Sequence, residues 1–151
     1  MIKKMSVKTE LGWISAFENN GKIFEVKFGK HKNKFVSKNL KKFRNNLINF
    51  LNRKNNSFES DFLIKGNIIQ KQVWKELTRI KLGKTKSYGE IAKKFKLSPR
   101  HVGKICGQNK IAIAIPCHRV IRSDGSMGGF SSRGEIILKK KILDFEKSWK
   151  Q

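Results

Sequence analysis

The sequence predicts an α+β protein, in which an N-terminal α/β lobe with a small antiparallel sheet precedes a mainly helical C-terminal domain. Apolar and polar residues alternate through much of residues 5–29, as they do in half-buried strands. Residues 39–53 and 69–80 instead carry apolar residues at helical spacing, and Gly66 lies between these two helices. We therefore expect a supporting lobe of residues 1–66 and a second domain of residues 67–151.

The N-terminal lobe is predicted to begin with a strand hairpin or meander. Asn19-Asn20-Gly21 is a strong two-residue turn signal, and the residues after it alternate between apolar side chains and lysine or glutamate. In that strand the expected inward set is Phe24, Val26 and Phe28. We expect Gly12 to kink the first strand, and residues 62–64 to add one more short strand.

The charge balance of the chain indicates a polyanionic partner. Lys and Arg number 35 against 11 Asp and Glu, which gives a formal charge of +24. Nucleic acid is favoured over an anionic membrane, because the sequence contains no amphipathic anchor or lipidation signal. A lysine-rich composition that has nothing to do with binding also explains part of the excess. With no signal-peptide core and no run that approaches a membrane span, we expect a cytoplasmic protein that stays with the DNA.

Two short helices in the second half form a candidate DNA-binding motif. Ser87-Tyr88-Gly89-Glu90 has the Ser-x-x-Glu form of a capping box, and Ser98-Pro99 offers a second helix start. A pair of short helices joined by a tight turn, in a strongly basic chain, is compatible with a helix-turn-helix. The pattern by itself is common in small helical proteins.

The second of these helices has two different faces. Val102, Ile105 and Cys106 share one face, which we expect to be buried. Glycine inside a helix costs about 1 kcal/mol relative to alanine, so two glycines on the other face need a reason. Close approach to a DNA groove is one reason, and close packing against another helix is the alternative. The opposite face consists of Arg100, Gly103, Lys104 and Gly107.

A cysteine in an unusual setting follows this helix pair. The alternating residues Ile111, Ile113 and Ile115 predict a buried strand, and Pro116-Cys117-His118-Arg119 stands at its end. The two cysteines of the chain, Cys106 and Cys117, do not form a disulfide framework. The N-terminal lobe shows neither metal-ligand spacing nor paired carboxylates. We expect no metal and no cofactor.

Several motifs together resemble the O6-alkylguanine-DNA alkyltransferases, over about residues 73–146. The family moves an alkyl group from O6 of guanine in duplex DNA to a cysteine of the protein itself, irreversibly. The resemblance therefore implies a DNA-repair protein that works once, with weaker action on O4-methylthymine. The matching motifs, in order, are Ser87-Tyr88-Gly89-Glu90-Ile91-Ala92, Arg100-His101-Val102-Gly103, Asn109, Ile115-Pro116-Cys117-His118-Arg119-Val120-Ile121 and Gly128-Gly129-Phe130-Ser131.

The resemblance makes Cys117 the nucleophile and methyl acceptor. A methyl transfer needs a thiolate, and a free cysteine with a pKa of about 8.5 is mostly protonated at neutral pH. His118 is the available base, directly or through a water, and needs a carboxylate to hold its tautomer. Glu146 resembles the orienting glutamate of the family. The interval from Cys117 is slightly longer than in the family, so Asp144 remains an alternative.

The remaining roles come from the resemblance. The target base must leave the duplex, and Arg100 would fill the space that it vacates, with the helix approaching from the minor groove. Tyr88 would rotate the nucleotide at its phosphate, with Gly103 and Lys104 at the DNA surface. Asn109 would brace the helix pair against the active-site strand. The base itself would meet Ser131 near O6 and the backbone carbonyls of Cys117 and Val120, whereas Arg119 is expected to hold its loop internally.

The sequence differs from the family pattern in two places, and two other classes of DNA-binding protein are alternatives. The chain lacks the prolines that the family often has near Lys110 and Ala112, and Phe130 stands where tyrosine is common. An alkyltransferase-like protein that only binds damaged bases would lack the nucleophile, so Cys117 argues against that class. An ordinary DNA-binding regulator would leave the Pro-Cys-His-Arg-Val run unexplained. We expect a monomer that binds double-stranded DNA containing O6-alkylguanine.

Overall fold

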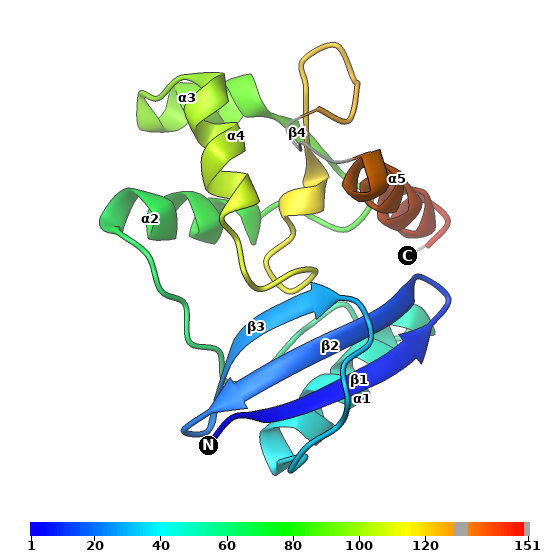
Figure 1. Cartoon of the computed structure of the whole chain (residues 1–151). Helices are drawn as coiled ribbons and strands as arrows, with labels where there is room; N and C mark the ends of the chain where they lie inside the picture. Colours follow the sequence, from blue (N-terminus) through cyan, green and yellow to red (C-terminus); the bar gives the residue numbers. More distant parts are fainter. Residues whose placement is uncertain (129–132, 150–151) are drawn as a thin grey trace. The chain divides into compact units, whose positions relative to one another are not determined.

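The computed structural model describes residues 1–128 and 133–149, and divides into two compact units (Figure 1). The N-terminal unit comprises Met1–Lys65 together with Lys110–Ala114, and the C-terminal unit comprises Gly66–Asn109 and Ile115–Gln151. The α+β fold class is confirmed. Residues 110–114 belong to the first unit, whereas the sequence predicted them in the second domain.

The N-terminal unit is a three-stranded antiparallel sheet with one helix. Strands β1 (Lys3–Thr9), β2 (Gly12–Asn19) and β3 (Lys22–Phe28) pair in the order β1-β2-β3. Helix α1 (Lys38–Leu51) begins at the N-cap Ser37, whose side chain accepts a hydrogen bond from the Leu40 amide. Its apolar stripe is buried with the inner face of the sheet, which forms the core of this unit from Leu40, Phe43, Leu47, Phe50, Ile14, Ala16, Ile23 and Val26.

Three strand predictions for this unit were wrong. Gly12 does not kink a strand; it begins β2 after a turn at residues 10–11, with a positive φ of 106° that favours glycine. A β-bulge between Phe17 and Glu18 shifts the register of β2 against β3, so that Ile23 and Val26 are buried while Phe24 is partly exposed. Residues 62–64 contribute a single bridge, between Phe62 and Ile23, rather than a strand.

The predicted buried strand at residues 111–115 is also absent. Ile111 forms one parallel bridge with Val26, where the Val26 amide donates to the Lys110 carbonyl and the Ala112 amide donates to the Val26 carbonyl. The chain then turns, and Ile113 has a φ of 69°, which ends any extended conformation. The isoleucines are buried as expected, but they are buried within turns.

The C-terminal unit is mainly helical. It contains α2 (Ile68–Leu77), α3 (Tyr88–Phe95), α4 (Pro99–Gly107), the short 3-10 helix η1 (Cys117–Arg119) and α5 (Arg133–Lys147). Strands β4 (Lys86–Ser87) and β5 (Val120–Ile121) form a parallel pair. This pair places the residues after β5 beside the start of α3.

The capping signals at α3 and α4 act as predicted. Ser87 and Glu90 form a reciprocal capping box at the start of α3, and the Ser98 side chain accepts a hydrogen bond from the His101 amide at the start of α4. Lys96, with a φ of 56°, ends α3 in the left-handed conformation and turns the chain into α4. The face of α4 predicted to be buried is buried, at Val102, Ile105 and Cys106.

Truncating the core face of α1 should destabilise the protein strongly. Leu47 is 0% exposed, so Leu47→Ala should lower the free energy of unfolding by about 2–5 kcal/mol through lost burial and a residual cavity. Its neighbour Ile48 is 40% exposed and serves as the control, with an expected loss of less than about 1 kcal/mol for Ile48→Ala. Urea denaturation measures both, and equal losses would contradict this assignment of the core.

Candidate active site and nucleic-acid interface

Cys117 is the first residue of η1 and is partly exposed. Backbone hydrogen bonds hold the short helix on both sides, since the Cys117 amide donates to the Ile115 carbonyl and the Val120 amide donates to the Cys117 carbonyl. The Asn109 side-chain amide donates to the same Ile115 carbonyl at 2.9 Å. Asn109 thus holds the turn that precedes the cysteine, although the segment is not the strand that the sequence suggested.

A buried carboxylate connects the two residues that follow Cys117. Glu146 Oε2 lies 3.0 Å from His118 Nε2 and accepts a hydrogen bond from Arg119 Nη2 at 2.7 Å, and Glu146 Oε1 accepts from Arg119 Nε at 2.9 Å. Arg119 Nη1 donates to the Ile80 carbonyl at 2.7 Å. Of the two carboxylates considered for this position, Glu146 reaches His118, whereas Asp144 is exposed and pairs with Lys140.

The electrostatics of this cluster give each group a definite charge at neutral pH. Burial by itself would raise the pKa of Glu146, but hydrogen bonds from His118 and Arg119 outweigh it and lower this pKa to about 2. Because a guanidinium is always charged, Arg119 favours the ionised form of Glu146 whatever the charge of His118. Burial lowers the pKa of His118 despite the hydrogen bond to Glu146. The imidazole is therefore neutral, and it can accept a proton while Glu146 stabilises the charge.

A buried lysine adjoins the same site and was missed from the sequence. Lys139 is 4% exposed, and its Nζ donates to Tyr88 Oη at 3.0 Å and to the Met127 carbonyl at 2.9 Å. Burial lowers its pKa, while the nearby thiols of Cys117 and Cys106 act to raise it. Lys139 lies two helical turns before Glu146 on the buried stripe of α5. A charged residue at that spacing was the signal that could have identified it.

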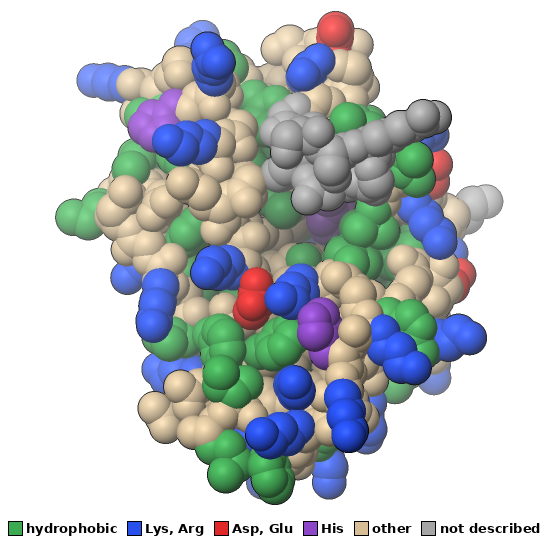
Figure 2. All heavy atoms as spheres, viewed as in Figure 1, with side chains coloured by type: hydrophobic (Ala, Val, Ile, Leu, Met, Phe, Trp, Pro, Cys, Tyr) green, Lys and Arg blue, Asp and Glu red, His purple; other side chains and the backbone are tan. Residues whose placement is uncertain are grey.

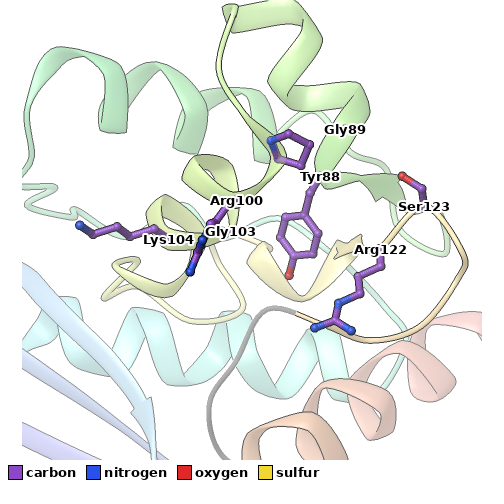
Figure 3. A pocket seen from close by; sticks show the side chains of 8 residues that line it. Tyr88, Gly89, Arg100, Gly103, Lys104, Arg122 and Ser123 are labelled. Carbon is purple, nitrogen blue, oxygen red and sulfur yellow. The ribbon is translucent and has the colours of Figure 1, made fainter.

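A pocket of about 540 Å³ lies between α4 and the end of β5 (Figure 3). Its lining brings together Tyr88 with three residues of the predicted DNA-facing side of α4. A Cβ placed on Gly103 would lie 3.8 Å from the Tyr88 ring, which is ordinary contact, so internal packing does not require glycine there. The lining residues are Tyr88, Gly89, Pro99, Arg100, Gly103, Lys104, Arg122 and Ser123.

Of two residues predicted to contact the base, the structure describes Val120 but not Ser131. The Val120 side chain is fully buried, so that only its backbone could contact a base. Ser131 lies outside the described residues, as do Gly129 and Phe130. Tyr88 adjoins both the pocket and the active site. Its ring lines the pocket, and its hydroxyl accepts a hydrogen bond from Lys139.

The surface is basic over both units. Figure 2 shows Lys and Arg side chains spread across the visible face, with few acidic groups among them. Within residues 1–128 and 133–149, no group of three or more His, Cys, Asp or Glu side chains could hold a metal ion. In the same part of the chain, none of the helices has the length and apolar character needed to cross a membrane.

The chain matches the family described as 6-O-methylguanine DNA methyltransferase, DNA binding domain, over residues 68–148, and belongs to that family. It is 42% identical over 93 residues to the methylated-DNA–protein-cysteine methyltransferase of Mycobacterium tuberculosis, covering 60% of this chain and 55% of the relative. A relative of the same name from Sulfolobus acidocaldarius is 49% identical over 80 residues, covering 53% and 50%. The matches thus span about half the length of these relatives.

Solved structures extend the likeness to the whole fold. The structure of M. tuberculosis O6-methylguanine methyltransferase matches with a TM-score of 0.86 at 26% identity, covering 100% of this chain and 96% of the other. A structure of M. tuberculosis OGT in complex with DNA matches with a TM-score of 0.82 at 27% identity, covering 96% and 92%.

Removing the Glu146 charge should weaken the fold in a pH-dependent way. Glu146→Gln should lower the free energy of unfolding at neutral pH by about 3–5 kcal/mol, because it leaves Arg119 buried without a counter-ion. In the wild type the folded-state pKa of Glu146 is depressed, so its stabilising effect is complete above about pH 4.5 and is lost as the pH falls toward 2. The variant should lack that part of the acid destabilisation.

Urea denaturation between neutral and acidic pH measures both effects. Asp144→Asn is the matched control, because its side chain is exposed on the same helix, and it should change the free energy of unfolding by less than about 0.5 kcal/mol. Equal losses for the two variants would show that Glu146 carries no special electrostatic role.

The two thiols should differ sharply in reactivity. Burial raises the pKa of Cys106 to about 12, and its side chain is 1% exposed, whereas Cys117 is partly exposed. A thiol-alkylating reagent should therefore modify Cys117 in the folded protein and reach Cys106 only after denaturation. Peptide mapping after timed labelling tests this, and equal labelling rates would mean that the packing of α4 is wrongly assigned.

Proposed function

We propose that this protein repairs alkylated DNA by transferring the alkyl group from O6 of guanine to Sγ of its own Cys117. The observation that carries the proposal is the partly exposed Cys117 beside His118, which is held by the Glu146–Arg119 pair, in a chain of the 6-O-methylguanine DNA methyltransferase family. The DNA complex of a structural relative supports the same class of ligand.

The reaction balances with the groups present. The Cys117 thiolate attacks the alkyl carbon, the S–C bond forms as the C–O6 bond breaks, and guanine leaves as an anion that takes up a proton. The product is a thioether, whose sulfur is a poor leaving group and which no group in the cluster can hydrolyse. Each molecule therefore reacts once, and the protein is a stoichiometric reagent.

Formation of the thiolate is assigned to His118. Its Nε2 is engaged by Glu146, so Nδ1 is the ring nitrogen that takes the thiol proton, directly or through a water. Glu146 then stabilises the imidazolium, and Arg119 keeps Glu146 ionised and in place. The Lys139 ammonium is close enough to interact with the Cys117 thiolate and favours its negative charge.

DNA recognition is assigned to α3 and α4 acting as a helix-turn-helix that approaches from the minor groove. Arg100 and Lys104 are exposed on the pocket side of α4, and Gly103 leaves room for the nucleic-acid backbone. Guanine O6 is inaccessible inside a base pair, so the nucleotide must be extruded, with Arg100 filling the space it leaves and Tyr88 lining its path. Ser131 is proposed to approach O6, and Asn109 holds the turn before Cys117.

The wider biological setting is part of the same proposal. The protein acts as a monomer on double-stranded DNA, without a cofactor, in the cytoplasm with the DNA. O4-methylthymine presents an equivalent alkoxy group beside a ring nitrogen, and is the second and poorer substrate.

Intact mass after incubation with a duplex containing one O6-methylguanine tests the proposal. We expect every active molecule to gain one methyl group in place of the thiol proton, located on Cys117 by peptide mapping. Cys117→Ala should abolish the gain, and the buried Cys106→Ala should retain it. Tight binding of the damaged duplex with an unchanged mass would overturn the repair function in favour of a protein that only recognises the lesion.

A further inference from the structure

Arg122 lies at the edge of the pocket, directly after the Pro-Cys-His-Arg-Val-Ile run. It follows β5 directly and is the first residue of a hydrogen-bonded turn. In this turn the Arg122 amide donates to the Ser126 carbonyl at 3.0 Å, and the Gly125 amide donates to the Arg122 carbonyl at 2.9 Å. Asp124 braces the turn by accepting from the amide and hydroxyl of Ser126 at 2.9 and 2.7 Å. The backbone that carries the Arg122 side chain is therefore well held.

The stem of the side chain lies directly against the Gly128 backbone. A Cβ built on Gly128 would overlap Nε, Cγ and Cδ of Arg122, so a larger residue at 128 would require the arginine to move. Figure 3 shows Arg122 on one side of the Tyr88 ring, and Arg100 and Lys104 on the other. The Arg122 guanidinium points to the side of the ring that carries the hydroxyl group.

The Arg122 guanidinium is exposed, and within the described part of the chain it makes no hydrogen bond or ion pair. Hydrogen bonds from Ser126 lower the pKa of the Asp124 carboxyl, and the charge of Arg122 contributes to that lowering. The described lining of the pocket includes three basic side chains and no carboxylate. A planar guanidinium binds phosphate oxygens through two parallel hydrogen bonds, and such a basic pocket favours an anion.

Ser123 adds a neutral donor at the same edge. Its Oγ would lie 3.5 Å from a Cβ on Gly89, which places the hydroxyl over the first turn of α3. Gly89 has no side chain to cover this approach. Because Ser123 lines the same pocket as Arg122, its hydroxyl is available to an anion bound there.

We propose that Arg122, assisted by Ser123, binds a backbone phosphodiester next to the extruded nucleotide and so positions the alkylated base for Cys117. The inference rests on the proposed function. Tyr88 connects the two places, because its ring lines the pocket beside Arg122 while its hydroxyl contacts Lys139 near the thiol. Arg122 is thus a positioning residue that acts through the DNA backbone, distinct from the role of Arg100 in the duplex.

Arg122→Ala should slow alkyl transfer from duplex DNA by about tenfold, the effect of one charged hydrogen-bonded contact. Transfer from the free base O6-methylguanine, which carries no phosphate, should be unchanged. Arg122→Lys should recover part of the loss, because an ammonium keeps the charge without the two-point geometry. Arg44→Ala removes one positive charge from the N-terminal unit and should leave both rates near those of the wild type.

A methylphosphonate scan identifies the phosphate. In this scan each phosphate around the lesion is replaced in turn by a neutral methylphosphonate. At one position the wild-type transfer rate should fall by the same factor as Arg122→Ala causes, and the rate of the Arg122→Ala variant should fall no further. The transfer rate of Arg100→Ala should still fall by that factor at the same position. The inference would be overturned if every methylphosphonate lowered the transfer rate of Arg122→Ala as much as that of the wild type. It would also be overturned if Arg122→Ala slowed transfer from the free base as much as transfer from the duplex. Failure of the proposed function would appear separately, as wild-type protein that never alkylates Cys117.

Discussion

The site depends on one buried carboxylate. Glu146 is 1% exposed, and both of its oxygens accept hydrogen bonds, from Arg119 on one side and from Arg119 and His118 on the other. Arg119 also donates a hydrogen bond to the Ile80 carbonyl. Its guanidinium therefore connects α5 and η1 to the segment after α2. Removing one partner of a buried ion pair is strongly destabilising, because it leaves the other charge buried without compensation. The fold and the activation of Cys117 therefore share one electrostatic centre.

Helix α5 carries two buried charged side chains close to the active site. Lys139 and Glu146 lie two turns apart on its buried stripe, and they contact Tyr88 and His118 respectively. The ammonium favours the thiolate, and the carboxylate favours the protonated imidazole that remains after the thiol has lost its proton. In the proposed reaction the helix thus stabilises the charge-separated pair rather than the neutral thiol and imidazole.

Local signals predicted local structure, and the errors concern contacts between distant residues. The capping box at Ser87 and the buried face of α4 depend on residues within two helical turns, so the sequence shows them directly. The bulge at Phe17 depends on pairing with another strand, and the isoleucines near Ile113 are buried in turns, so alternation alone was misleading there. Lys139 contacts Tyr88 across 51 residues. The choice of Glu146 over Asp144 was available from helix phase, which puts Glu146 on the stripe of Ile142 and Leu143.

The most direct test of the central electrostatic claim is the single-turnover rate constant of methyl transfer to Cys117 as a function of pH, for wild type, Asp144→Asn and Glu146→Gln, each shown to be folded. Asp144→Asn should match the wild type. Glu146→Gln should be slower by at least about tenfold at neutral pH, and this deficit should shrink as the pH rises and the thiol ionises without help. A folded Glu146→Gln variant that transfers the methyl group at the wild-type rate across this range would show that Glu146 has no part in activating Cys117.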